Sequence, residues 1–341
     1  RGTSPDFLKN AEVRQLDFVP IPHNVDYELD FHRPGIDAIK LNCACQSKSG
    51  MKRIEDVFDV WFESGAMPYG QVGYPLDFAR GKPFQTKKLA YPADFIAEGV
   101  DQTRGWFYSL LVLGVGLFDR SPYKNVVVNG LILAEDGQKM SKRFNNYPDL
   151  NLTINKCGAD ALRFYLLSSP AVRAEEFGFS ERGLGEVMRR VIMRLKNVLA
   201  FYQLYAPKNS PVQTEPSELS SNLLDVWIKS RLGELNQLVA QALDAYEVDK
   251  AGKPIDEFID DFSTWYLRRS RERFKGEVRR DQENAELILR YLLQQTAKLL
   301  APFTPFIAEE VWQKVKGEGD EESVHLSNWA EEKDFDLKIL S

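Results

Sequence analysis

The chain has 341 residues, of which 43% are hydrophobic and 28% charged, and its net charge is −6. This composition is typical of a folded globular protein and excludes a disordered or fibrous one, and the length predicts about two domains. Three cysteines are too few for a disulfide framework, so we expect a reduced, cytoplasmic setting. No apolar run reaches the roughly 18 residues that a membrane span needs, and the N-terminus predicts no secretory leader.

The first part of the chain mixes short β-rich runs with loops. Strands are predicted at 56–62, 93–97 and 126–134, each bounded by Gly, Pro or Asp. Between the last two lies 102–118, which is apolar at helical spacing and follows Asp101, a candidate N-cap. Strand, helix and strand in this order predict a parallel α/β unit that binds its ligand at the carboxyl ends of the strands.

The second part of the chain carries helical periodicity instead of strand signals. Apolar residues recur at three- and four-residue spacing in five segments, and a proline-rich loop is expected at 206–218. The predicted helices cover 181–205, 223–246, 255–275, 285–303 and 305–316. We therefore expect an α/β domain over residues 1–175 followed by an all-α helical bundle over residues 176–341.

A short basic loop is the first candidate for chemistry. The run Lys139-Met140-Ser141-Lys142-Arg143 follows an Asp136-Gly137 turn and places three cations in five residues. Such a loop can lay positive charge on a polyphosphate as negative charge develops there. Taken alone, the run favours an ordinary solvated loop, because short basic loops are common.

Two segments upstream of the loop also carry polar residues. The segments are DVWFESG at 59–65 and PADFIAEGVDQTRGWFY at 92–108. In the second, Glu98, Asp101 and Gln102 lie at a predicted strand-to-helix turn, where they can accept hydrogen bonds from ribose hydroxyls or an ammonium group. Helix capping is the structural alternative for these acids, and core packing is the alternative for the tryptophans.

Taken together and in this order, the three segments resemble the isoleucyl-tRNA synthetases, a family of class I enzymes. The basic run resembles the class I KMSKS loop, with Arg143 where serine is more usual. The valyl and leucyl relatives have different sequences in the two upstream segments. Farther along, GADALR at 158–163 and PFTPFIAEEVW at 302–312 resemble parts of the helical anticodon-binding domain of the family.

The resemblance implies the second half of a Rossmann-like nucleotide-binding domain followed by a helical anticodon-binding domain. It implies ATP-dependent activation of isoleucine to isoleucyl-adenylate, with Mg²⁺, and transfer of the isoleucyl group to tRNA(Ile). By this resemblance, Glu98, Gly99, Asp101 and Gln102 contact the adenylate, Trp61 and Trp106 line the side-chain pocket, and Lys142 with Lys139 binds the ATP phosphates catalytically.

Two parts of such an enzyme are missing from this sequence. The class I HIGH motif needs two histidines three residues apart, and His23, His32 and His325 do not have that spacing. The inserted editing domain is also missing. We therefore expect the C-terminal part of a monomeric synthetase, inactive alone, whose N-terminal half lies in the same or another chain. The alternatives are a tRNA-binding protein that has lost catalysis and a valyl-type relative.

The cysteines give little support for a metal. Relatives often carry half of a four-cysteine zinc site where Cys43 and Cys45 stand, and a structural site needs four ligands. Cys157 is far along the chain, so at most half a site is evident and we expect no metal site in this chain. Two reduced cysteines are the simpler interpretation.

A basic segment in the helical part is the candidate surface for RNA. Between 268 and 280 there are seven cations and two anions, in a chain that is acidic overall. At helical spacing Arg268, Arg271, Lys275 and Arg279 would share one face, with Arg269 and Arg273 beside it. Such a face suits tRNA phosphates. The alternative is pairing with Glu272, Glu277 or a neighbouring helix. A second basic stretch at 189–196 is expected to line the junction toward the tRNA stem.

Overall fold

The computed structural model describes residues 22–26, 28–40, 51–55, 60–74, 76–77, 82–83, 91–141, 143, 146–205, 222–276, 278–330 and 339. They belong to two compact units, Arg1–Glu63 and Ser64–Ser341. The expected domain boundary at 175/176 falls inside the second unit and stays a prediction.

The first unit contains little regular structure among its described residues. A short 3₁₀ helix covers Gly35–Ala38, and helix α1 (Val60–Gly70) begins in this unit and continues into the second. The predicted strand at 56–62 is wrong for its last three residues, because they form the first turn of α1. Residues 56–59 lie outside the described part of the chain.

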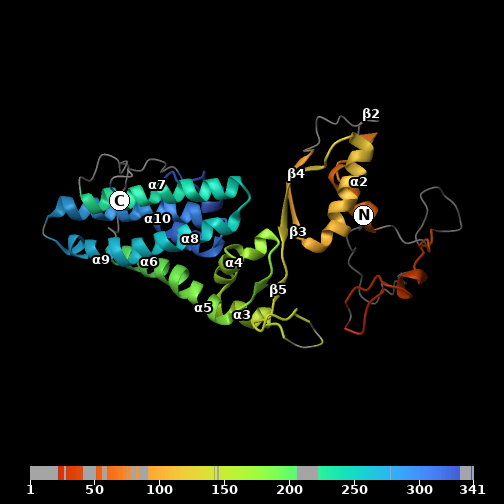
Figure 1. Cartoon of the computed structure of the whole chain (residues 1–341), viewed down its shortest axis with the longest axis horizontal. Coiled ribbons are helices and arrows are strands. Elements are labelled where there is room, and N and C mark those ends of the chain that lie inside the picture. Colours follow the sequence, from red (N-terminus) through yellow and green to blue (C-terminus); the bar gives the residue numbers. More distant parts are fainter. Residues whose placement is uncertain are drawn as a thin grey trace, which may run out of the picture. The chain divides into compact units, whose positions relative to one another are not determined.

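The second unit of the chain contains a parallel β-α-β unit, as the sequence predicts. Strands β3 (Ala93–Gly99) and β4 (Tyr123–Asn129) pair in parallel, with Ala93 opposite Tyr123 and Gly99 opposite Asn129. Helix α2 (Trp106–Phe118) connects them (Figure 1). The buried side chains of Ile96, Phe107 and Leu110 pack between helix and sheet and hold the unit together.

The strand predicted at 126–134 is two strands, because the chain changes partner at Gly130. Strand β5 (Ile132–Leu133) pairs in parallel with β6 (Phe177–Gly178) instead of with β3. The Gly130 amide donates to the Ala171 carbonyl at 2.6 Å. A Cβ at Gly130 would lie 1.9 Å from the Glu175 carbonyl oxygen, so only glycine allows this close approach.

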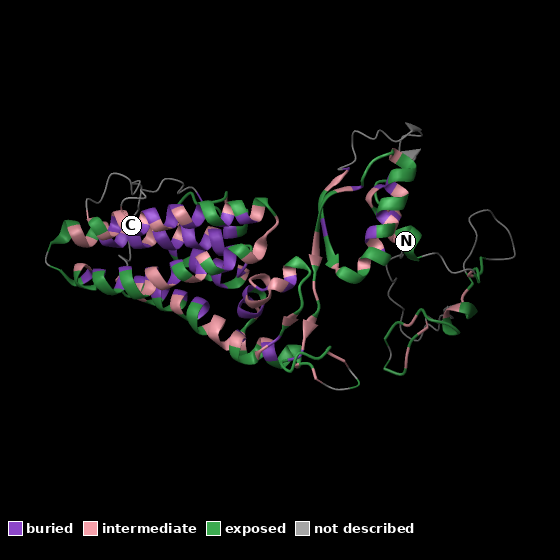
Figure 2. Ribbon diagram, in the orientation of Figure 1, coloured by how far each residue is buried: buried purple, intermediate pink, exposed green. Residues whose placement is uncertain are grey.

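Much apolar surface of the β-α-β unit remains exposed (Figure 2). On α2, the exposed fractions are 62% for Tyr108, 48% for Val112 and 50% for Leu117, and Phe95 on β3 is 53% exposed. Parallel sheets are normally covered on both faces, and contiguous apolar patches mark surfaces that another element covers. The two-stranded parallel sheet thus has the surface of an incomplete layer.

The remaining secondary structure is mostly helical, and each of the five predicted helical segments is found. Two π-helical turns, Met188–Met193 and Asp261–Tyr266, join α5 to α6 and α8 to α9. Helices α3 and α4 were not predicted. The expected loop at 206–218 lies outside the described residues. The helices are α3 (Leu150–Cys157), α4 (Ala159–Leu167), α5 (Glu181–Val187), α6 (Arg194–Tyr205), α7 (Leu223–Asp244), α8 (Val248–Asp260), α9 (Leu267–Ser270), α10 (Arg279–Leu300) and α11 (Pro305–Val315).

Short elements complete the described chain. Strands β1 and β2 form a small antiparallel ladder, and 3₁₀ turns occur between the longer elements. These elements are β1 (Leu76–Asp77), β2 (Lys82–Pro83), and the 3₁₀ turns Val100–Arg104, Pro170–Arg173, Arg271–Lys275 and Val324–Leu326.

The long helices share one apolar core (Figure 2). Ile228 and Leu232 of α7, Phe258 of α8 and Leu292 of α10 are fully buried in it. Their spacing places one apolar face of each helix inward, which is why helical periodicity alone was sufficient to predict the bundle. Since these side chains lie in one cluster, the bundle has a continuous interior.

The two downstream motifs, at 158–163 and 302–312, contact each other. The Asp160 carboxylate accepts hydrogen bonds from the backbone amides of Phe306 at 3.2 Å and Ile307 at 2.6 Å. It thereby satisfies two free N–H groups in the first turn of α11. Arg163 donates to the carbonyl of Pro302 at 3.0 Å. The two motifs together join α4 to α11.

A buried carboxyl in α10 makes the stability of the bundle depend on pH. Glu286 is 9% exposed, and this burial raises the pKa of its carboxyl above the ordinary value; Gln282 donates to it at 3.1 Å. The folded state therefore binds this proton more tightly than the unfolded state, so stability falls as pH rises through the two pKa values. We expect Glu286→Gln to raise Tm at pH 7 and to leave it unchanged below about pH 4. Thermal unfolding followed by circular dichroism across this range measures the difference, and a constant difference at all pH values would contradict the assignment.

Candidate functional site

The carboxyl end of β3 carries the first group of predicted site residues. The Glu98 side chain is exposed and makes no hydrogen bond or ion pair with another described residue. Gly99 closes the strand beside Asn129 of β4. A Cβ at Gly99 would lie 2.6 Å from Oδ1 of Asp101, so a side chain there would displace that carboxylate. This end of the sheet therefore presents two exposed carboxylates next to a glycine.

The N-terminus of α2 is capped not by Asp101, which the sequence predicts, but by another residue of the turn after Gly99. Asp101 is not the N-cap of α2, because a 3₁₀ turn over Val100–Arg104 intervenes and α2 begins only at Trp106. Instead, Gln102 Oε1 accepts the Trp106 amide at 2.9 Å, and Gln102 Nε2 donates to Asp101 at 3.2 Å. Gln102 thus satisfies a free N–H of α2 and orients Asp101.

The two predicted pocket tryptophans belong to different units of the chain. Trp106 is half-buried, and its indole Nε1 donates to the Ser64 carbonyl at 3.0 Å. It therefore anchors the part of α1 that lies in the second unit. Trp61 lies in the first unit and is 50% exposed. The structure thus brings Glu98, Gly99, Asp101, Gln102 and Trp106 together on one strand-to-helix turn.

The basic loop follows β5 through a tight reverse turn. Leu133 and Lys139 form an antiparallel bridge, and the Ala134 amide donates to the Gln138 carbonyl at 2.8 Å. Gly137 has a φ of +78°, a left-handed conformation that the turn requires and that glycine adopts without strain. Lys139 is exposed, whereas Lys142 lies outside the described residues. The turn thus projects Lys139 from the end of β5.

Asn146 anchors this loop, a role that the sequence did not reveal. Its Oδ1 accepts the Ser141 amide at 2.8 Å, and its Nδ2 donates to the Lys139 carbonyl at 3.2 Å. Met140 packs partly against the helical core and, with Ser141, lines an apolar pocket of about 440 Å³. The loop is therefore fixed at its base by one amide side chain and borders open space.

Four cations of the predicted tRNA-binding segment, Arg268, Arg269, Arg271 and Lys275, lie on α9 and the 3₁₀ turn that follows it. All four are exposed, and none forms an ion pair with another described residue. Arg279 is not on the same helical face, because the helix ends at Lys275 and Arg279 begins α10. The exposed basic surface consists of Arg268, Arg269, Arg271 and Lys275.

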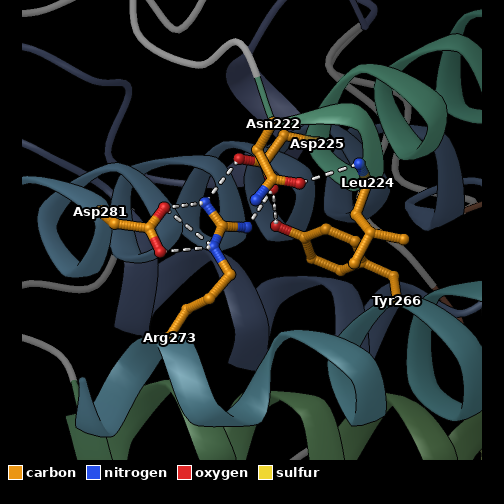
Figure 3. Close-up of polar contacts among 6 residues, drawn as sticks. All are labelled: Asn222, Leu224, Asp225, Tyr266, Arg273 and Asp281. Carbon is orange, nitrogen blue, oxygen red and sulfur yellow. Dashed lines mark hydrogen bonds and ion pairs between the residues drawn. The ribbon is translucent and has the colours of Figure 1, made fainter. Parts of the chain in front are cut away.

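Arg273 lies within the same segment but is a structural residue (Figure 3). Its guanidinium contacts both carboxylate oxygens of Asp225, at 2.7 and 2.8 Å, and Asp281 at 2.9 Å. Tyr266 donates to the same Asp225 at 2.8 Å. Burial opposes the charge of Arg273, but the bonds to both aspartates outweigh it and raise its pKa. Burial and the Asp225 charge raise the pKa of Tyr266 as well.

The second basic stretch pairs with neighbouring helices. Arg190 contacts Asp256 at 2.7 Å, Arg194 contacts Asp260 at 3.0 Å, and Lys196 contacts Glu310 at 3.2 Å. Cations that already have an acidic partner in the folded chain offer less net charge to a nucleic acid. These three residues therefore pair within the protein, and contact of this stretch with the tRNA stem stays a prediction.

Metal ligands and membrane spans were sought among the described residues. There, no group of three or more His, Cys, Asp or Glu side chains could hold a metal ion. Cys43 and Cys45 lie outside this part of the chain, and Cys157 is a free, partly buried thiol. Within the described ranges, no helix is long and apolar enough to cross a membrane.

Known families match both halves of the chain. Residues 24–178 match the family described as tRNA synthetases class I (I, L, M and V), and residues 225–340 match the anticodon-binding domain of tRNA ligases. A LeuRS from Agrobacterium radiobacter K84, solved in a ternary complex with tRNA and LeuAMS, has the same fold. It superimposes with a TM-score of 0.58 and 20% identity over 89% of this chain and 36% of that chain.

Individual relatives of the chain indicate which member of the class I family it resembles. The isoleucine–tRNA ligase of Chlamydia trachomatis serovar A is 46% identical over 304 residues, which cover 88% of this chain and 28% of that protein. The enzyme of the same name from Treponema pallidum is 41% identical over 314 residues, with the same coverage. The chain thus spans about 28% of the length of these relatives. Residues 24–178 thus belong to the family of class I tRNA synthetases and residues 225–340 to the anticodon-binding domain of tRNA ligases, and the chain is similar to the isoleucine–tRNA ligases.

Proposed function

We propose that this chain is the C-terminal part of the catalytic domain and the anticodon-binding domain of an isoleucine–tRNA ligase. The complete enzyme would activate isoleucine with ATP and transfer the isoleucyl group to tRNA(Ile). The observation that carries the proposal is the 46% identity over 88% of the chain. A continuous match of that extent necessarily includes both the strand-end residues and the basic loop.

The geometry supports a division of roles. At the end of β3, the exposed carboxylates of Glu98 and Asp101 can accept hydrogen bonds from the ammonium group and ribose of an isoleucyl-adenylate. Gly99 leaves room beside them. Lys139 and Lys142 would contact the ATP phosphates and stabilise negative charge as the isoleucine carboxylate displaces pyrophosphate. Trp106 is the proposed wall of the side-chain pocket on this turn, and the role of Trp61 stays a prediction.

The residues that the structure describes form no metal site. Mg²⁺ is the usual counter-ion of ATP phosphates, but the described carboxylates do not gather into a group that could hold it. We therefore assign no step to the metal and expect Mg²⁺ to arrive with ATP.

The exposed apolar surface of the β-α-β unit indicates that another layer of structure covers it in the complete enzyme. The apolar faces of α2 and β3 are those of a parallel sheet that lacks its neighbours. We infer that the N-terminal half of the nucleotide-binding domain covers them, from the same or another polypeptide, within a monomeric cytoplasmic enzyme.

Isoleucine-dependent exchange of labelled pyrophosphate into ATP tests this proposal. We expect no exchange by the 341-residue chain alone and restored exchange after addition of a separately produced N-terminal half. Valine in place of isoleucine distinguishes the valyl-type alternative. Binding of tRNA by the chain, with no exchange even in the presence of the N-terminal half, would indicate a tRNA-binding protein that has lost catalysis.

Asn146→Ala should slow adenylate formation in the reconstituted enzyme. The change removes both hydrogen bonds that fix the base of the basic loop, and each contributes about 0.5–1.5 kcal/mol. The expected loss in kcat is therefore roughly tenfold, measured by pyrophosphate exchange at saturating ATP. Asn125→Ala is the matched control, because Asn125 donates to Asp94 near the opposite end of the sheet. Equal losses in the two variants would show that Asn146 has no special role in the loop.

A further inference from the structure

We propose that Trp265 and Arg269 form a stacking platform for an unpaired base of RNA. The inference rests on the proposed function, because it assumes that the helical bundle binds tRNA. It adds a specific recognition element, Trp265, to a basic surface that would otherwise contact only phosphates.

Trp265 is a large apolar side chain that is only partly buried. It is 45% exposed, while its neighbours Phe262 and Tyr266 are fully buried. All three lie in the π-helical turn Asp261–Tyr266, and such turns recur at functional sites. Inside the protein Trp265 contacts Trp227 of α7, with ring centroids 6.4 Å apart and planes tilted by 60°. The indole is therefore held from one side and remains accessible to solvent.

The guanidinium of Arg269 lies over the indole ring of Trp265. Its guanidinium carbon lies 3.7 Å from the centre of the Trp265 ring, four residues along the helix. This distance places the guanidinium directly over the ring, in a cation–π contact. Arg269 forms no ion pair with another described residue. A flat aromatic ring and a flat cation are thus presented together at an exposed site.

The cations around Trp265 and Arg269 indicate that the ligand of this platform is an anion, and the platform itself suits a ligand with flat rings. Arg268, Arg271 and Lys275 are exposed next to the platform, and the one exposed acid between them is Glu272 among the residues that the structure describes. In single-stranded RNA, unstacked bases pack on aromatic side chains and guanidinium planes while cations contact the phosphates. The platform and the three cations match those two requirements side by side.

Titration of the 341-residue chain with an unmodified tRNA transcript bearing an isoleucine anticodon tests the inference. We expect Trp265→Ala to weaken binding by about 5- to 100-fold at every salt concentration, because one base–aromatic stack is lost. The slope of log K against log salt should stay unchanged, since no phosphate contact is removed. Arg268→Ala should instead reduce that slope by about one unit.

Two milder variants separate stacking from charge and from misfolding. Arg269→Lys keeps the charge but loses the planar stack, so it should weaken binding without changing the slope. Trp265→Phe keeps a smaller ring and should retain most of the affinity, while the quenching of tryptophan fluorescence by tRNA becomes smaller than in the wild type. Phe306→Ala, which removes a 68% exposed aromatic ring from α11, is the matched control and should bind normally.

The outcomes distinguish this inference from the proposed function. If the wild type binds tRNA tightly and Trp265→Ala changes the dissociation constant by less than about twofold, the platform is overturned. The proposed function would then remain intact. Wild-type quenching that persists in Trp265→Phe would also overturn it. Lack of tRNA binding by the wild-type chain at low salt would overturn tRNA binding by the bundle, and the platform with it.

Discussion

Replacing Asp225 with alanine is expected to lower the free energy of unfolding of this chain by about 3–5 kcal/mol. The Asp225 side chain is 1% exposed, and it holds Arg273, whose side chain is 10% exposed, through two hydrogen bonds. Without this carboxylate, the guanidinium stays buried with one partner fewer, and the Tyr266 hydroxyl loses its acceptor. Urea unfolding followed by circular dichroism measures the loss.

Asp281→Ala is the matched control for this prediction. Asp281 contacts the same guanidinium, but its side chain is 41% exposed. Water can replace an exposed partner, so we expect a loss of about 1 kcal/mol or less. Similar losses in the two variants would show that burial of Asp225 does not determine the effect.

A double variant separates the charge from the packing. Replacing a whole buried ion pair by apolar residues often costs little, whereas removing one partner costs much. Asp225→Leu combined with Arg273→Met should therefore lose less stability than Asp225→Leu alone. This non-additivity is a direct measure of the coupling between the two side chains. Additive losses would contradict a coupled network.

The same network connects stability to the basic surface. Arg273 lies between Arg271 and Lys275, and it fixes this 3₁₀ turn to α7 and α10. Its neighbours can point outward because Arg273 points inward. One strongly basic segment therefore contains a cation that stabilises the bundle and others that are available to RNA.

The sequence could not distinguish these two kinds of arginine. Helical spacing assigns each residue to a face, but it does not show which face meets an acid on another helix. Arg273 and Asp225 are 48 residues apart, so their contact depends on how α7 packs against the turn. Arg190, Arg194 and Lys196 show the same effect, since their partners lie on α8 and α11.

The parts of the fold that were predictable are those fixed by local pattern. Apolar periodicity gave each long helix, and two apolar runs around a helix gave β3, α2 and β4. The break at Gly130 was not predictable, because it depends on the distant carbonyls of Ala171 and Glu175. At the candidate site, the family resemblance supplied Glu98 and Lys139, whereas Asn146 carries no local signal for its anchoring role.

Lys142→Ala in the complete enzyme is expected to reduce the rate of adenylate formation by about 100- to 1,000-fold. The side chain would place its charge on the phosphates mainly as negative charge develops, so its loss should lower kcat and leave the affinity for isoleucine nearly unchanged. Pyrophosphate exchange gives the rate, and equilibrium binding of isoleucine gives the affinity. Lys142 lies outside the described residues, and this expectation rests on the resemblance of the run 139–143 to the class I KMSKS loop.

Two lysine variants make the result specific. Lys139→Ala should give a smaller loss, since we propose only an assisting role for Lys139. Lys156→Ala should have no effect on the rate, because Lys156 on α3 already pairs with Glu181 at 2.9 Å. If Lys142→Ala weakened isoleucine binding as much as it slowed the reaction, the lysine would serve ground-state binding and not transition-state stabilisation. The charge that acts on the phosphates would then have to come from elsewhere in the loop, with Arg143 the next residue to replace.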